Sequence, residues 1–233
     1  MMIGETVKDI DVHIPRDAYD MGKDTPTFNV YLTIIVRDSK GNVIRVHRQR
    51  SHSPTTNFIA LILPVNYYTT TGSSITITGL GGATYNYQPA FSTSGYDIAY
   101  PNAANNYPSY LVEIEVGNGK QSNPLTATNL ASPIANGSGS GQLIYGAPTI
   151  PSNITVSGGS AYFYISQTFS NQSGGTVTIT EVGIVTKIQI VQPSGNNSGG
   201  NYTLLTWYDA LSSSISVSNG GSVTIYYTFT VNP

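Results

Sequence analysis

Histidine is the first residue type to weigh for chemistry, because its imidazole binds metal ions and transfers protons near neutral pH. The chain contains three histidines, His13, His47 and His52, and no cysteine. A metal site needs imidazoles that converge with carboxylates or thiolates, and the five-residue spacing of His47 and His52 matches no ligand motif. We therefore expect hydrogen-bonded or surface histidines, and we expect no metal site, cofactor or disulfide.

The serines and carboxylates also give no catalytic pattern. No G-x-S-x-G turn is present to hold a nucleophilic serine. Glycoside hydrolysis needs two carboxyl groups, and Glu113, Glu115 and Glu181 are the candidates. Glu113 and Glu115 alternate with apolar residues, so we expect both to point to solvent. We expect Glu181 to accept backbone N–H groups left unpaired at a strand irregularity, and we predict that the protein is not an enzyme.

The remaining charged groups match no ligand-binding motif. The aspartates before residue 25 lack the spacing of a calcium-binding hand, and Gly79 to Gly82 lacks the lysine and helix of a phosphate loop. A basic cluster at Arg45, His47, Arg48 and Arg50 is the main positive patch. The formal net charge is −2 and the pI is about 5.8, so we expect no nucleic-acid partner.

Charge is concentrated at one end of the chain. Eight of the ten lysines and arginines and seven of the twelve acids precede residue 51. The later residues expose mainly Ser, Thr, Asn, Gly and Tyr, which are polar without titrating near neutral pH. The longest apolar run, Ile59 to Val65, is too short to span a bilayer. The N-terminus lacks a secretory apolar segment, so we expect synthesis in the cytoplasm without a signal peptide.

Two early segments favour contacts between subunits. Residues 1–27 show no sustained period and predict an extended N-terminal arm, in which Ile10, Val12 and Ile14 alternate with polar residues and suit an added strand. Residues 28–37 and 43–51 flank a glycine-containing loop and predict a hairpin that carries the basic cluster. The predicted contact residues are Ile10, Val12, Ile14, Arg45, His47, Arg48 and Arg50.

The middle of the chain gives weaker signals. Ser53 to Pro64 favours a short helix, with a fully buried strand as the alternative. Eight of the seventeen tyrosines lie between Tyr67 and Tyr110. Strands are expected at 74–78, 110–116, 143–145 and 153–156, with a long loop at 117–142.

The last seventy residues carry the strongest pattern, because apolar and polar side chains alternate between glycine-rich turns. We read them as successive hairpins, with strands at 160–169, 176–191, 201–207, 214–218 and 222–231. Val177 and Ile179 are odd-numbered whereas Val182 and Ile184 are even-numbered, so a bulge or bend is required between residues 180 and 183. The predicted fold is all-β, an antiparallel, jelly-roll-like β-sandwich with one or two short helices at most. Residues 28–233 are expected to form one domain, and a second small β subdomain within 66–150 is left open.

Residues 178–184 (TITEVGI), 204–211 (LLTWYDAL), 214–231 and 36–59 resemble structural proteins of virions, of the kind found in tailed phages and archaeal viruses. The resemblance covers about half of the chain. It implies a jelly-roll-like capsid, turret, spike or tail-associated subunit, present in many copies in an extracellular particle. Its partners would be copies of itself, other virion proteins and a host-surface glycan. The alternatives are a carbohydrate-binding or adhesin module and a filament subunit that shares strands.

Overall fold

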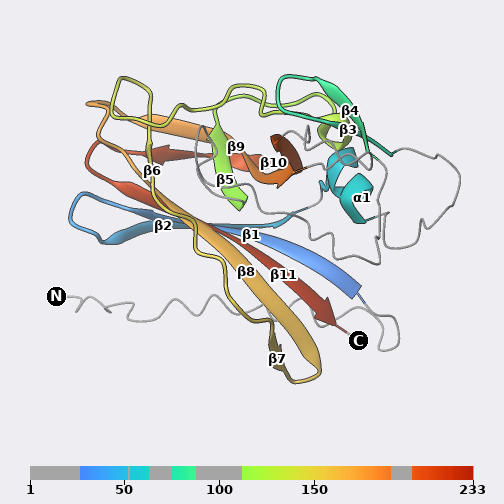
Figure 1. Ribbon diagram of the computed structural model, residues 1–233. Helices are drawn as coiled ribbons and strands as arrows, with labels where there is room; N and C mark the ends of the chain where they lie inside the picture. The colour runs from blue at the N-terminus through green and yellow to red at the C-terminus, as the bar shows by residue number, and fades with distance from the viewer. Residues whose placement is uncertain (1–26, 52, 63–74, 88–111, 190–200, 233) are drawn as a thin grey trace, which may run out of the picture.

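The computed structural model describes residues 27–51, 53–62, 75–87, 112–189 and 201–232. They form a β-sandwich of two antiparallel sheets with one short α-helix (Figure 1). The predicted arm, with Ile10, Val12 and Ile14, lies outside the described residues. The all-β prediction is confirmed.

The six-stranded sheet has the order β2-β1-β11-β8-β6, and β7 also pairs with β8. Its three long central strands are paired over nearly their whole length. Its strands are β1 (Thr27–Arg37), β2 (Val43–Ser51), β6 (Ile144–Tyr145), β7 (Thr155–Ser157), β8 (Ser160–Ser170) and β11 (Ser222–Asn232).

The opposing three-stranded sheet has the order β10-β9-β5, and a separate hairpin of two strands lies beside it. The sheet consists of β5 (Val112–Gly117), β9 (Val177–Gln189) and β10 (Asn201–Val217), and the hairpin of β3 (Ile75–Thr78) and β4 (Thr84–Tyr87). The helix α1 (Thr56–Ile62) confirms the helical alternative. A single 3₁₀ turn at Pro124–Thr126 interrupts the long loop.

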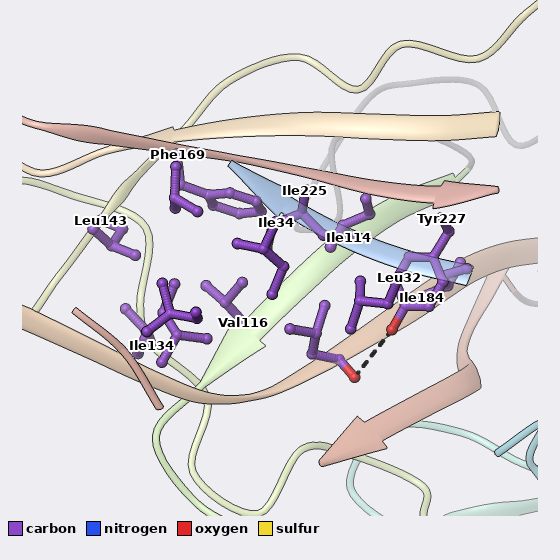
Figure 2. Close-up of a cluster of buried hydrophobic side chains, with 14 of the residues drawn as sticks. Leu32, Ile34, Ile114, Val116, Ile134, Leu143, Phe169, Ile184, Ile225 and Tyr227 are labelled. Carbon is purple, nitrogen blue, oxygen red and sulfur yellow. Dashed lines mark hydrogen bonds between the residues drawn. The ribbon is translucent and has the colours of Figure 1, made fainter. Parts of the chain in front are cut away.

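The main core lies between the two sheets. Leu32, Ile34 and Ile225 from the six-stranded sheet meet Ile114 and Ile184 from the three-stranded sheet, and all are buried (Figure 2). Full burial of one such side chain contributes about 1.5–3 kcal/mol. The alternation seen in the sequence therefore places one face of β1, β8, β9, β10 and β11 in this core.

A second, smaller cluster covers the other face of the three-stranded sheet. It contains Leu130 and Ala127 from the long loop and Val185, Leu205 and Tyr208 from the sheet. Both faces of this sheet are thus covered, so its strands are buried on both sides.

Helix α1 and the small hairpin are attached to β10. The Phe58 ring packs edge-on against the Trp207 indole, with centroids 5.1 Å apart. The Asn57 side chain donates to the Thr78 carbonyl and accepts from the Thr78 N–H, at 2.7 and 2.9 Å. These contacts fix the hairpin beside the helix, close to one end of β10.

The pairing of successive strands was predicted wrongly in two places. β8 pairs with β11, not with β9, and β11 does not pair with β10. The two connections instead cross between the sheets, and Asn171 holds them together. Its side chain donates to the carbonyls of Gly175 and Val217 at 2.8 and 2.7 Å. Its backbone N–H bonds the Gly221 carbonyl and its carbonyl accepts from the Gly220 N–H. The two strands predicted at 201–207 and 214–218 are parts of one strand, β10, which ends at Val217.

The predicted irregularity near residue 180 is confirmed. β9 is continuous, but its register with β10 shifts between the pairs Glu181–Ala210 and Ile179–Ile215. The extra residues belong to β10, at positions 211–214. Beyond this shift, Val182 pairs with Asp209. The odd-numbered Val177 and Ile179 and the even-numbered Val182 and Ile184 of β9 all reach the core. The change of phase in the sequence therefore coincides with a bulge at which residues 211–214 of β10 lie opposite Thr180 alone.

Candidate functional site

Glu181 is a fully buried carboxylate that organises the long loop. Its Oε1 accepts the backbone N–H groups of Gly119 and Ser132 at 3.2 and 2.8 Å, and its Oε2 accepts that of Ala131 at 3.0 Å. The prediction that Glu181 serves unpaired backbone donors is confirmed, although the donors belong to the loop. Burial raises the pKa of the neighbouring Tyr208 to about 12, against the opposing effect of the Gln121 N–H.

Glu113 and Glu115 are buried, which corrects the prediction that they point to solvent. The reason is that the outer face of the three-stranded sheet is covered, which a single strand's pattern does not reveal. Glu113, Glu115 and Glu181 lie on this same face by register. The described residues contain no group of three or more His, Cys, Asp or Glu arranged to hold a metal ion.

A buried polar network that the sequence reading missed lies inside the main core. Ser51 and Tyr227 donate their hydroxyls to Asp209 Oδ2 at 2.5 and 2.9 Å. The Trp207 indole N–H donates in turn to Ser51 Oγ. Burial, followed by the Asp209 charge, raises the pKa of Tyr227 well above its ordinary value. The sequence feature that could have indicated this network is Asp209, the one acid after Glu181.

This network joins the two sheets at one side of the sandwich, because Ser51 ends β2 and Asp209 lies in β10. Its hydroxyl and indole groups surround the carboxylate inside the core. Such a satisfied, buried arrangement fixes the register of the sheets, and it has the form of a structural network.

The inner face of β2 continues this connection to β10. Arg45 donates to the Ser214 carbonyl and to Ser213 Oγ, each at 2.8 Å. Gln49 donates to the Ala210 carbonyl at 3.1 Å and accepts from the Ser212 N–H at 3.0 Å. β10 has no β9 partner at residues 211–214, so side chains of β2 satisfy its backbone there.

The outer face of β2 is solvent-exposed. Val46, Arg48 and Arg50 lie on it, opposite in direction to Arg45, His47 and Gln49. Arg50 donates to the Asn29 side-chain oxygen at 2.7 Å. The predicted basic cluster is therefore divided: Arg45 and His47 face β10 of the same chain, whereas Arg48 and Arg50 face away from it.

Three of the four sandwich edges are covered by the chain itself. The β8 edge pairs in turn with β7, with Thr149 and with β6. On the β5 edge, Gly117 forms a β-bridge with Pro133, and the Ile114 N–H donates to the Gln167 side-chain oxygen, 2.7 Å away. The β10 edge bridges to Pro54 and accepts the Leu80 N–H at the Thr203 carbonyl, 2.9 Å away.

The fourth edge is β2. Within the described ranges no strand pairs with its outer side, which forms the margin of the six-stranded sheet in Figure 1. The strand has nine residues and exposes Ile44 and Val46 by 56% and 42%. β7 also exposes an apolar side chain, Val156, but it has only three residues. A long uncovered edge with apolar side chains is a template for pairing with another strand.

No helix among the described residues is long and apolar enough to cross a membrane. No protein-family model, curated protein sequence or solved structure matches this chain.

Proposed function

We propose that this chain is a non-enzymatic structural subunit that acts by assembling with copies of itself, as a capsid, turret, spike or tail-associated subunit of a virion. The observation that carries the proposal is the β2 edge, which is long, has no outer strand partner among the described residues and exposes Ile44 and Val46. Proteins that remain monomeric usually shorten or cover such an edge. Within the described ranges the chain covers its other three edges, and no strand pairs with this one.

The rest of the fold supports a mechanical role. The sheets are joined through the main core, and the Asp209 network and the Arg45 and Gln49 contacts join their margins. Polar contacts of this kind hold one packing arrangement of the two sheets. The surface beyond residue 50 carries few charges, which allows close packing of copies without long-range repulsion. The resemblance of the strand segments to virion structural proteins agrees with this role.

Val46→Glu tests the proposal. A charged side chain on an edge strand disfavours the addition of another strand, so we expect the dissociation constant for self-association to rise about tenfold or more. Sedimentation velocity over a range of concentrations measures the effect. Thr168→Glu is the matched control, because Thr168 is exposed on the same face of the sheet but lies on β8, away from β2. Equal association of both variants and the wild type would show that copies do not meet at this edge.

A carbohydrate-binding role is the second candidate. The outer face of the six-stranded sheet carries Tyr164 of β8 and Tyr226 of β11, with ring centroids 6.0 Å apart. Both side chains are half-buried, so their rings form a partly exposed platform. Rings of this kind stack on sugars. A chain that remains monomeric and binds polysaccharide, with binding lost in Tyr164→Ser/Tyr226→Ser, would favour this role over assembly.

A further inference from the structure

The β2 edge carries positive charge, and its own strand supplies no matching acid. Arg45, Arg48 and Arg50 lie on it, and the strand has no Asp or Glu. The hydrogen-bond acceptors of Arg45 and Arg50 are neutral: a serine carbonyl, a serine hydroxyl and an asparagine oxygen. Arg48 is exposed. The edge therefore offers cationic side chains to whatever pairs with it.

This charge disfavours some registers in which β2 would pair with β2 of another copy. In an antiparallel pair centred on Arg48, the two Arg48 side chains would lie directly opposite each other on one face, and a pair centred on Gln49 would place Arg48 opposite Arg50. A pair centred on His47 avoids both clashes, but it leaves the arginines opposite neutral side chains. Like charges directly opposite each other destabilise a strand pair. An acidic strand would instead complement the edge.

The chain itself contains such a segment. Asp9 and Asp11 are two residues apart, as are Arg48 and Arg50, so each pair shares one face of an extended strand. The intervening and following residues, Ile10, Val12 and Ile14, occupy the opposite face. These residues lie outside the described part of the chain.

We infer that residues 9–14 of a second copy add to β2 as an antiparallel strand, with Asp11 opposite Arg48 and Asp9 opposite Arg50. This register places the acids on the outer face of the six-stranded sheet. It also places Ile10, Val12 and Ile14 on the face that turns towards the three-stranded sheet. Their opposite residues on β2 would be Gln49, His47 and Arg45, so the charge pairs on the outer face set this register. The inference rests on the proposed assembly function and names the partner segment.

A charge exchange in the full-length chain tests this pairing. The arm variant is Asp9→Lys/Asp11→Lys, and the edge variant is Arg48→Glu/Arg50→Glu. Each variant replaces two attractive pairs by two repulsive ones, so we expect each to raise the dissociation constant for self-association about tenfold or more. The fourfold variant combines both changes and retains the wild-type formal net charge of −2. We expect it to associate like the wild type, and we expect an equimolar mixture of arm and edge variants to associate as well.

Asp17→Lys/Asp20→Lys is the matched control, because it changes net charge equally in the same region without touching the proposed strand. Circular dichroism establishes that every variant is folded before its mass is measured. Association of the arm variant at wild-type strength would overturn the inference and leave the assembly function standing. A fourfold variant that stays dissociated would also overturn it. A monomeric wild type at every concentration would overturn the assembly function itself, and docking of the arm on its own chain would then be the remaining arrangement.

Discussion

Glu181→Ala is expected to lower the free energy of unfolding by about 3–5 kcal/mol, because three backbone N–H groups lose their acceptor together. Those donors belong to Gly119, Ala131 and Ser132, in a loop that covers one face of the three-stranded sheet. The three N–H groups are partly buried, so hydrogen bonds to water do not fully replace the hydrogen bonds lost with the carboxylate. Urea unfolding followed by circular dichroism measures the change.

Glu181→Gln is the control for shape. It keeps one acceptor oxygen but turns an amide NH₂ towards backbone donors, so we expect an intermediate loss of stability. Hydrogen exchange then locates the effect, with faster exchange expected first at residues 118–134. A Glu181→Ala protein as stable as the wild type would show that this carboxylate does not hold the loop.

Asp209→Ala is expected to cost about 2–5 kcal/mol of unfolding free energy. The Ser51 and Tyr227 hydroxyls would lose the oxygen to which both donate, inside the main core. Trp207 is the one tryptophan of the chain, and its indole N–H donates to Ser51 Oγ. Its fluorescence therefore reports on the network directly, and we expect its emission to shift in the folded variant.

Two comparisons separate this network from simple loss of volume. Asp209→Asn keeps an acceptor oxygen at nearly constant size, so its loss should be smaller. The double variant Ser51→Ala/Asp209→Ala should lose less than the sum of the single losses, because the two residues share one hydrogen bond. Additive losses and an unchanged emission spectrum would contradict a coupled network.

The local elements of this fold follow from the sequence to a large extent. The Asp38 carboxylate accepts the N–H groups of Lys40 and Asn42, each at 2.9 Å, and so shapes the turn between β1 and β2 that the glycine-containing loop predicts. The odd-to-even change of apolar phase in β9 located the bulge near residue 180. These features depend on residues that are close together in the sequence, so the residue pattern predicts them.

Strand pairing across the sandwich did not follow from the sequence. Alternation in β8 and β11 shows which face is buried, but it does not show which strand lies alongside. Asn219-Gly220-Gly221 has the composition of a hairpin turn, yet it connects two sheets, because Asn171 binds the turn from a distant part of the chain. The same limit explains Glu113 and Glu115, whose burial depends on a loop that covers the sheet.

The candidate site was predicted in part. The basic cluster was identified, but the register of β1 with β2 decides that Arg45 faces β10 and Arg48 faces solvent. The two-residue period of a strand places Arg45 and Arg48 on opposite faces of β2. Only the fold shows which of these faces lies against β10. Pairing of Ile10, Val12 and Ile14 stays a prediction.

Concentration-dependent hydrogen exchange of the full chain tests most directly whether copies meet at the β2 edge. Exchange is measured by mass spectrometry at a dilution where the chain is monomeric and at a concentration where its mass shows association. We predict that residues 43–51 gain protection with association, while residues 155–162, at the opposite margin of the same sheet, exchange equally at both concentrations. Association that leaves the exchange of residues 43–51 unchanged would contradict the assignment of this edge as the contact between subunits.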